Sequence, residues 1–391
     1  MQSLECNCGK THIAPLESYV IECGAVNKLP EILASYRSVY MVCDQNTYVA
    51  AGERVERLLC DSGKLSHKHV LPKNTLPDTE AVGDTLVHLY PPEAEGNTNG
   101  FSPLPDFILA VGSGTVNDIC RLVSYRTHIP YGIVATAPSM DGYASAGSPI
   151  LYDGTKATVK CTTPRHIIAD LDIIKNAPLD MIKAGIGDMF GKYTGLLDWE
   201  LARDYSGEYF CDNISARVLK ATNDCLDNSH LIKTRETAVI NNIFEGFMVT
   251  GLGMAYVGNS RPASGSEHIV AHAWELMSVE EGKKPSLHGL EVCEATLLVA
   301  VMYKRLYNET DDIHLKGLIE KYLPYFERVE QFCRDLEVPP ATLDKAKILS
   351  GIKRALTLRD RYTILFYLRD KGLYDNYAEY AAEELVKFYE K

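Results

Sequence analysis

The sequence predicts an N-terminal half with a parallel β-sheet flanked by helices, followed by an all-helical C-terminal half. Two observations lead to this fold class. Short apolar runs alternate with helical periodicity as far as residue 176, the pattern of a parallel sheet with helices on its faces. From residue 177 to residue 391, long stretches with a helical apolar period follow, without a convincing strand. We therefore predict an α/β domain over 1–176 and a helical domain over 177–391.

Composition and charge exclude several classes of protein. The 391 residues are 46% hydrophobic and 24% charged, as in soluble globular proteins. A formal net charge of −12 argues against nucleic acid or an anionic membrane as the main partner. No apolar run reaches the roughly 20 residues that span a bilayer, and the N-terminus lacks a signal pattern. We expect a cytoplasmic protein without membrane insertion, whose 11 cysteines stay reduced.

The predicted elements of the first half follow in order along the chain. The predicted strands are SVYMVCD (38–44), DFILAVGSGT (106–115), YGIVATAP (131–138) and RHIIADLDII (165–174). Between the second and third strands, the apolar residues over 116–123 have the spacing of one helix face. A hairpin around Asp153-Gly154 is predicted over 148–161.

The N-terminal segment CNCGKTH holds possible soft metal ligands at Cys6, Cys8 and His12. A structural zinc usually takes four ligands, with cysteine pairs spaced more widely than C-x-C. Three candidates in this tight frame are weak evidence for a metal. A short strand or hairpin is therefore favoured for the segment.

A glycine-rich turn, VGSGTVND (111–118), joins the second predicted strand to the helix that follows it. Gly112 and Gly114 let backbone amides approach a phosphate, and the helix N-terminus adds positive potential. The usual dinucleotide fingerprint G-x-G-x-x-G does not apply, because Asn117 replaces its third glycine and the acid at a strand end, Asp44, precedes the turn. A tight turn that merely needs small residues stays open as the alternative.

A second polar turn, TAPSMDGYASAG (136–147), follows the next predicted strand. Thr136 and Ser139 offer hydroxyl groups, and Asp141 and Ser145 come soon after them. Adjacent strand ends that carry small and polar residues are where an open parallel sheet binds ligands. Together the two turns predict a nucleotide site.

A metal site is the hypothesis for the helical half. In SGSEHIVAHAWE, His268 and His272 lie one turn apart on a predicted helix, on a face separate from its apolar stripe. Asp188, in GIGDMFGKYTG, and His288, at the start of an apolar helix, are further candidates. Asp188, His268 and His288 would leave one coordination position open, as a catalytic metal requires. Zinc, nickel and ferrous iron all accept such a ligand set.

The same stretch excludes a metallopeptidase. The H-E-x-x-H motif needs a glutamate between its histidines as general base, whereas HIVAH has none and Glu267 precedes both histidines. Ser266 is the predicted N-cap of this helix, and Glu275 is expected on the same face as the histidines.

Five motifs carry a resemblance to a known superfamily. They are GSGTVNDICR, TAPSMDGYASAG, GDMFGKYTG, SGSEHIVAHAWE and LHGLEV. Together they resemble the iron- or zinc-dependent alcohol dehydrogenases, glycerol dehydrogenase and dehydroquinate synthase, and within that superfamily the bacterial sn-glycerol-1-phosphate dehydrogenases. The resemblance implies a dehydroquinate synthase-like fold. In that fold an NAD(P)-binding α/β domain precedes a helical domain that binds metal and substrate.

The resemblance also implies roles for single residues. The matched metal ligands are Asp188, His268 and His288, and the matched substrate contacts are Asp141, Asp188 and His272. Cofactor contacts are expected among Gly112, Gly114, Thr115, Val116, Asn117, Asp118, Thr136, Ala137, Pro138, Ser139 and Ser145. Asp44 favours NAD, because a carboxylate suits the ribose 2′-hydroxyl and repels a 2′-phosphate. Use of both NAD and NADP is plausible for this family.

The implied activity is the reversible reduction of dihydroxyacetone phosphate to sn-glycerol 1-phosphate. The metal would polarise the ketone while the nicotinamide delivers a hydride to C2. His272 and Asp188 are the expected catalytic residues, with His272 as proton source because an imidazole titrates near neutrality. For the substrate phosphate, Lys192 and Lys160 are the candidates, followed by Arg261, and each could instead be a solvated surface cation.

Other functions stay open at this point. The nearest alternative is a glycerol dehydrogenase that acts on an unphosphorylated polyol. A lyase of the dehydroquinate synthase kind and a metal-free, non-catalytic relative are further alternatives. The resemblance also suggests a homodimer, and a place either in ether-phospholipid synthesis or in polyol-phosphate metabolism.

Overall fold

The computed structural model describes residues 1–89, 104–152 and 155–390. These residues form two compact units. The first unit comprises Met1–Glu5, Thr11–Pro178 and Arg235–Tyr256, and the second comprises Cys6–Lys10, Leu179–Thr234 and Val257–Lys391. The predicted division at 176/177 falls close to Pro178. However, Arg235–Tyr256 belongs to the first unit, although the segments before and after it belong to the second. No sequence pattern indicated this.

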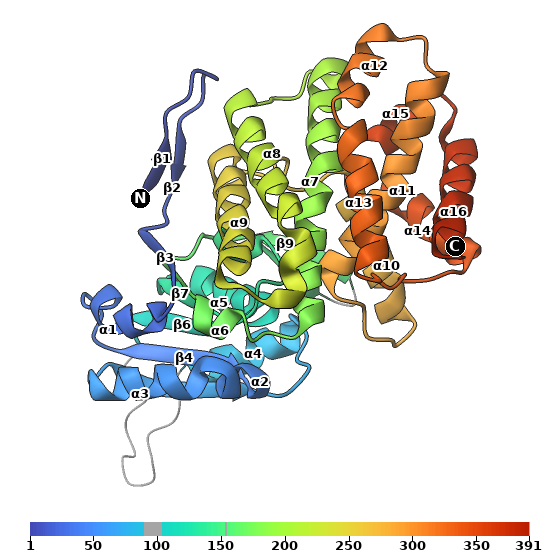
Figure 1. The fold of residues 1–391 in the computed structure, drawn as a ribbon. Coiled ribbons are helices and arrows are strands. Elements are labelled where there is room, and N and C mark those ends of the chain that lie inside the picture. Colours follow the sequence, from blue (N-terminus) through green and yellow to red (C-terminus); the bar gives the residue numbers. More distant parts are fainter. Residues whose placement is uncertain (90–103, 153–154, 391) are drawn as a thin grey trace. The chain divides into compact units, whose positions relative to one another are not determined.

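A six-stranded parallel sheet forms the centre of the first unit, in the order β3-β10-β7-β6-β4-β5 (Figure 1). Its strands are β3 (Ser18–Glu22), β4 (Val39–Asp44), β5 (Leu65–Leu71), β6 (Phe107–Gly112), β7 (Tyr131–Ala135) and β10 (His166–Asp170). The four predicted strands are confirmed. The other two, β3 and β5, were missed because they lie at the edges of the sheet. There burial is incomplete and polar residues interrupt the apolar run.

Both faces of the sheet are covered by helices. Val39, Met41 and Cys43 of β4 pack into an apolar core together with Val55 and Leu59 of α3 (Glu53–Asp61). On the opposite face, Tyr40 donates its hydroxyl hydrogen to the Thr85 carbonyl of α4 (Thr79–His88). Burial on both sides explains why the central strands are apolar at nearly every position.

Smaller elements complete the first unit. They are α1 (Leu29–Ile32), α2 (Gln45–Thr47), α5 (Gly114–Thr127), α6 (Leu171–Ile174), α9 (Thr237–Val257), and two antiparallel pairs, β1 (Gln2–Leu4) with β2 (His12–Ala14) and β8 (Gly147–Tyr152) with β9 (Thr155–Lys160). The second pair confirms the predicted hairpin, although its turn, Asp153-Gly154, lies outside the described residues. The first pair confirms a hairpin at the N-terminus.

Helix α9 is the one described helix whose length and composition would suit a membrane span. The sequence had not suggested such a segment. Of its most apolar window, 61% is buried inside the protein, which is typical of the core helix of a soluble protein.

The second unit is helical, and no strand occurs in residues 171–390 of the structure, as predicted. Its helices are α7 (Leu179–Ser206), α8 (Asp212–Asp227), α10 (Ser266–Glu280), α11 (His288–Glu309), α12 (Ile313–Glu320), α13 (Leu323–Asp335), α14 (Lys345–Leu358), α15 (Ile364–Asp370) and α16 (Tyr374–Glu390). The longest of them, α7, is buried along most of its length and carries several charged residues into the interior.

Candidate active site

A stripe of glycines along α7 allows two helices of the second unit to pack backbone against backbone. Gly187, Gly191 and Gly195 recur every four residues and so share one face of α7. A Cβ atom at Gly187 would overlap the carbonyl oxygen of Gly289 in α11, and one at Gly289 would overlap the carbonyl oxygen of Ala184 in α7. Any larger residue at these positions would force α7 and α11 apart.

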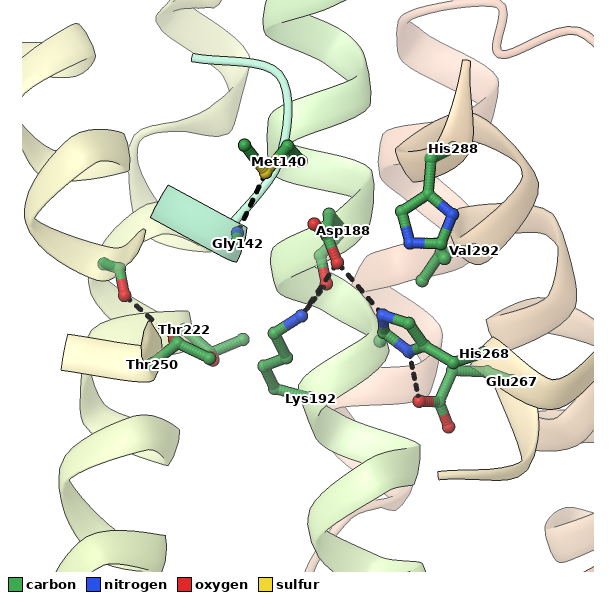
Figure 2. A network of polar contacts seen from close by, with 12 residues as sticks. Met140, Gly142, Asp188, Lys192, Thr222, Thr250, Glu267, His268, His288 and Val292 are labelled. Carbon is green, nitrogen blue, oxygen red and sulfur yellow. Dashed lines mark hydrogen bonds and ion pairs between the residues drawn. The ribbon is translucent and has the colours of Figure 1, made fainter. Parts of the chain in front are cut away.

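This close packing brings three candidate metal ligands together. Asp188 follows Gly187 in α7, His288 precedes Gly289 in α11, and His268 lies in the first turn of α10. One possible ligand atom of each lies within 4.8 Å of the other two. The closest pair, Asp188 Oδ1 and His268 Nε2, is 3.2 Å apart (Figure 2). The three residues predicted as ligands therefore meet at one place.

Each histidine of the trio is oriented by a carboxylate. His268 Nδ1 lies 2.7 Å from Glu267 Oε1, and His288 Nδ1 lies 2.7 Å from Glu275 Oε1. When Nδ1 carries the hydrogen of a neutral imidazole, Nε2 keeps the lone pair that a metal accepts. Metal-ligating histidines usually have such a partner on the other ring nitrogen. The residues present therefore fit a divalent cation.

Glu267 is itself fixed by groups around it. Its Oε2 accepts a hydrogen bond from Thr194 Oγ1 at 2.8 Å, and its Oε1 accepts one from the Gly265 amide at 2.7 Å. Burial raises the pKa of this carboxyl, but the hydrogen bond with His268, the charge of that imidazole and the hydrogen bonds from Gly265 and Thr194 together lower the net pKa. Glu267 therefore stays ionised and aligns His268. The sequence had indicated only that Glu267 is misplaced for a peptidase.

Lys192 neutralises the candidate ligand Asp188. Its Nζ donates to Asp188 Oδ1 at 2.8 Å and to the Asp188 carbonyl at 2.7 Å, one helical turn away. Burial would raise the pKa of Asp188, but Lys192 and the hydrogen bond from His268 hold it well below the usual range. Both of these Lys192 contacts go to Asp188, one to its carboxylate and one to its main-chain carbonyl. The predicted contact of Lys192 with the substrate phosphate stays a prediction.

The N-terminus of α10 is held by a buried carboxylate of α7. Asp198 Oδ2 accepts hydrogen bonds from the amide and the hydroxyl of Ser266, both at 2.6 Å, while Oδ1 accepts one from the Tyr303 hydroxyl. Burial and the nearby charge of Glu267 together raise the pKa of Asp198 to about 6. The prediction that Ser266 is the N-cap is wrong. Gly265 occupies that position, and the Ser266 hydroxyl donates to Asp198.

His272 lies beside the trio rather than within it. Its ring stacks on His288 with centroids 5.3 Å apart and an angle of 22° between the ring planes. His272, Glu275 and His288 form an overlapping group of possible ligands. Because Glu275 is already bonded to His288 Nδ1, we consider Asp188, His268 and His288 the better metal site.

Two arginines that the sequence did not indicate lie close to each other, and one of them, Arg359, contacts His272. Arg359 Nη2 is 3.4 Å from His272 Nδ1. Arg361 donates to the Ser264 carbonyl and the Ser260 hydroxyl. Burial lowers the pKa of Arg361 to about 9, and repulsion from Arg359 adds to this. Burial also lowers the pKa of Arg359, so a bound anion would stabilise both cations.

Arg261, in contrast, is buried against Glu208, with its guanidinium bonded to that carboxylate and to the Tyr362 carbonyl. A structural ion pair of this kind explains the residue without a substrate. Lys160 ends β9 at an exposed position of the first unit.

In the first unit, the predicted cofactor residues lie at the carboxyl ends of the central strands. From β4, the next strand along the chain, β5, lies on one side in the sheet. From β6, the next strands, β7 and β10, lie on the other side. The strand order therefore reverses between β4 and β6. Ligands of open α/β sheets bind at such a point. Asp44 ends β4 there, and Gly112 ends β6. A Cβ atom at Gly112 would lie 2.7 Å from Val116, so the turn into α5 requires glycine.

Asp44 also begins a helix. Its Oδ1 accepts the amides of Asn46 at 2.7 Å and Thr47 at 2.9 Å, as the N-cap of α2. One carboxylate oxygen is thus used structurally, and the predicted contact with a ribose would involve Oδ2.

The two predicted cofactor turns are joined by a buried arginine. Arg121 donates to Asp118 Oδ1 at 2.6 Å, to the Gly142 carbonyl at 2.6 Å and to the Gly147 carbonyl at 2.8 Å. Burial raises the pKa of Asp118 to about 6, against the charge of Arg121. Asp118 therefore has a structural partner, and its predicted contact with the cofactor stays a prediction. The i, i+3 spacing of the two residues was the available sequence signal.

Known proteins resemble this chain over nearly its whole length. The family described as iron-containing alcohol dehydrogenase matches residues 20–178. A glycerol-1-phosphate dehydrogenase (NAD(P)+) of Bacillus licheniformis is 34% identical over 94% of this chain and 92% of its own length. The enzyme of the same name from Bacillus subtilis is 33% identical, covering 88% of each chain. The chain belongs to the glycerol-1-phosphate dehydrogenase family.

Solved structures support the same fold. A probable glycerol dehydrogenase of Sinorhizobium meliloti aligns with a TM-score of 0.67 at 17% identity, covering 96% of this chain and 98% of that one. An iron-containing alcohol dehydrogenase of Thermotoga maritima aligns with a TM-score of 0.67 at 12% identity, covering 96% and 99%. At such identities the likeness concerns the fold alone, and it confirms the predicted dehydroquinate synthase-like fold.

The structure also identifies residues whose role the sequence did not show, because they hold the candidate metal ligands in place. Glu267 and Glu275 orient the two candidate ligand imidazoles. Asp198 anchors the helix that carries His268. The contacts of Glu275 and Asp198 join residues of different helices, so no fixed spacing in the sequence could have revealed them, whereas Glu267 directly precedes His268 in α10.

Proposed function

We propose that this chain catalyses the reversible, NAD(P)H-linked reduction of dihydroxyacetone phosphate to sn-glycerol 1-phosphate at a metal bound by Asp188, His268 and His288. The pair of imidazoles oriented by carboxylates, in a member of this family, carries the proposal. Three protein ligands leave a coordination position for a substrate oxygen.

The protein residues have distinct tasks in this proposal. A divalent metal would supply a Lewis acid for the substrate carbonyl, and the nicotinamide would supply the hydride. Glu267 and Glu275 hold the imidazoles so that Nε2 of each faces the metal position. Lys192 keeps Asp188 ionised. The ligand set suits zinc, nickel or ferrous iron, and availability decides among them.

His272 is the proposed proton donor to the oxygen at C2. Its ring lies against His288, beside the candidate metal ligands. Replacement by asparagine should lower turnover at saturating substrate about 100-fold or more, because a positioned acid contributes that much. Metal content should stay the same. An unaltered turnover and pH profile in His272→Asn would remove this role.

Arg359 is the proposed partner of the substrate phosphate, in addition to Lys192. It lies beside His272, its burial lowers its pKa so that a bound anion would stabilise its charge, and a guanidinium binds phosphate through paired hydrogen bonds. A glycerol dehydrogenase would not need such a cation, because its substrate carries no phosphate. A role of Arg359 in substrate binding would therefore favour the phosphorylated ketone as substrate.

The cofactor would bind at the strand ends of the first unit. The proposed contacts are Asp44, Gly112, Gly114, Thr115, Val116, Asn117, Asp118, Thr136, Ala137, Pro138, Ser139 and Ser145. Asp141, in the same unit, is the proposed additional substrate contact. We further propose that the protein works in the cytoplasm as a homodimer.

Comparison of two ketones as oxidants of NADH tests the proposed substrate. Dihydroxyacetone phosphate should be reduced with a much higher kcat/KM than dihydroxyacetone. In Arg359→Ala, KM for the phosphorylated ketone should rise, whereas activity on dihydroxyacetone should barely change. Equal or better activity of the wild type on dihydroxyacetone would favour a glycerol dehydrogenase instead. Removal of metal by a chelator should abolish activity, and added metal should restore it.

A further inference from the structure

A second cluster of soft ligands lies in the second unit and shares no residue with the candidate active site. Cys6 and Cys8 belong to the segment Cys6–Lys10, and Cys211 directly precedes α8. Their sulfur atoms lie within 4.8 Å of one another. The separation between the Sγ atoms of Cys6 and Cys211 is 3.6 Å. The sequence alone had shown only the first two cysteines, since Cys211 is 203 residues beyond Cys8.

The spacing of these sulfur atoms suits a metal better than a disulfide. A disulfide would place two of them about 2.05 Å apart. Around a tetrahedral zinc with Zn–S distances of about 2.3 Å, neighbouring sulfurs are roughly 3.8 Å apart. The separation of 3.6 Å between Cys6 and Cys211 is close to the second value.

The surroundings of the cluster are ordered by specific contacts. Cys8 Sγ lies 3.1 Å from the Tyr209 hydroxyl, and the Lys10 ammonium lies 3.5 Å from the centre of the Tyr209 ring. The Tyr209 carbonyl accepts a hydrogen bond from Trp199 Nε1 at 2.7 Å, which fixes it to α7.

Cys6, Cys8 and Cys211 all belong to the second unit and offer three thiol ligands to one ion. Cysteine sulfurs are the usual ligands of structural zinc sites, which hold the ion with four ligands.

We infer that Cys6, Cys8 and Cys211 bind a structural zinc ion. The ion would fasten the N-terminal segment Cys6–Lys10 to the start of α8. It takes no part in the reaction proposed above, so either proposal can fail without the other.

Zinc content measures this site directly. His268→Ala should remove the candidate catalytic metal, and this variant, dialysed against zinc and then against buffer, should retain one zinc ion per chain. Adding Cys211→Ser or Cys8→Ser to it should remove that ion. The matched control is Cys23→Ser, which changes an exposed cysteine of the first unit and should keep the zinc. Retention of one zinc ion in both cluster variants would overturn the inference.

Thiol labelling of the wild-type holoenzyme gives a second measurement that does not depend on the folding of variants. Cys6 and Cys8 should resist a maleimide until a zinc chelator is added, whereas the exposed Cys23 and Cys60 should react at once in both conditions. Labelling of Cys6 and Cys8 as fast as Cys23 without chelator, or a Cys6–Cys211 disulfide in the protein as purified, would contradict a zinc site.

Discussion

At the scale of single residues, the chemistry of the site depends on carboxylates that are not ligands. Glu275 illustrates this: it fixes the ring of His288 by accepting from Nδ1 at 2.7 Å. Without that acceptor, the ring can rotate, and the tautomer with hydrogen on Nε2 competes. The sequence placed Glu275 on the correct helix face, but the identity of its partner followed only from the position of α11.

Glu275→Gln should therefore weaken metal binding more than folding. Loss of an outer carboxylate typically costs about 10–100-fold in metal affinity. We expect a higher dissociation constant for zinc by this factor, and activity that recovers at high metal concentration. Glu280→Gln is the matched control on the same helix, because Glu280 pairs only with Arg354 in the contacts of the structure. Equal zinc affinities in the two variants would argue against this role.

At the scale of helices, the glycine contact between α7 and α11 sets the ligand geometry. Gly289→Ala should separate the helices, because its Cβ would overlap the backbone at Ala184. Overpacking of this kind costs about 1–3 kcal/mol, and metal binding should decline as well because His288 moves. Denaturant unfolding and metal analysis measure the two effects.

Gly317→Ala is the matched control for that substitution. Gly317 lies in α12, where an added Cβ meets nothing within 4 Å. Alanine in a helix interior should stabilise the protein by about 1 kcal/mol there. Similar destabilisation by both substitutions would show that the contact with Ala184 is unimportant.

A buried acid in α11 should make stability depend on pH. Burial raises the pKa of Glu294 to about 8, and Glu294 Oε2 accepts the Ala341 amide at 2.6 Å. The folded state thus keeps a proton that the unfolded state releases above pH 4.5. Because the folded state binds more protons between pH 4.5 and 8, the free energy of unfolding should fall as the pH rises through this window.

Glu294→Gln tests that dependence, because glutamine keeps an acceptor for Ala341 and has no titrating proton. Tm measured from pH 5 to pH 8 should fall less steeply in the variant than in the wild type. Parallel curves would mean that Glu294 does not hold its proton in the folded protein.

At the scale of the whole molecule, the proposed cofactor residue Asp44 and the candidate metal ligands belong to different units of the chain. Asp44→Ser should relax the preference for NAD, because it removes the charge opposed to a 2′-phosphate while serine still caps α2. We expect the ratio of kcat/KM for NADPH to that for NADH to rise about tenfold, equivalent to about 1.4 kcal/mol. Metal content should not change.

Asp78→Ser provides the matched control, since Asp78 caps α4 through the Ala81 amide. A similar shift in cofactor ratio for both variants would trace the effect to helix capping rather than to charge.

The sequence predicts those parts of the molecule whose structure produces a recognisable pattern in neighbouring residues, such as an apolar run or a helical period. Buried central strands such as β6 are apolar at every position, so their runs stand out, whereas β5, LSHKHVL, alternates polar residues and was missed. The candidate ligands were proposed from residue types and helix spacing, and a resemblance that links distant motifs implied the same three residues. Arg359 and Cys211 were not, because each approaches its site through tertiary packing, 87 and 205 residues from its closest partner.

The contact between α7 and α11 also determines which substitutions the site can accept in evolution or redesign. Where two helices touch through their main chains, the spacing between Asp188 and His288 does not depend on the size of the surrounding side chains. Neighbouring residues can therefore be exchanged without moving the ligands, provided that the glycines remain. Such a frame keeps the ligand positions independent of the side chains around them. Substrate range should thus be open to redesign by substitutions near His272, with Gly187 and Gly289 left untouched.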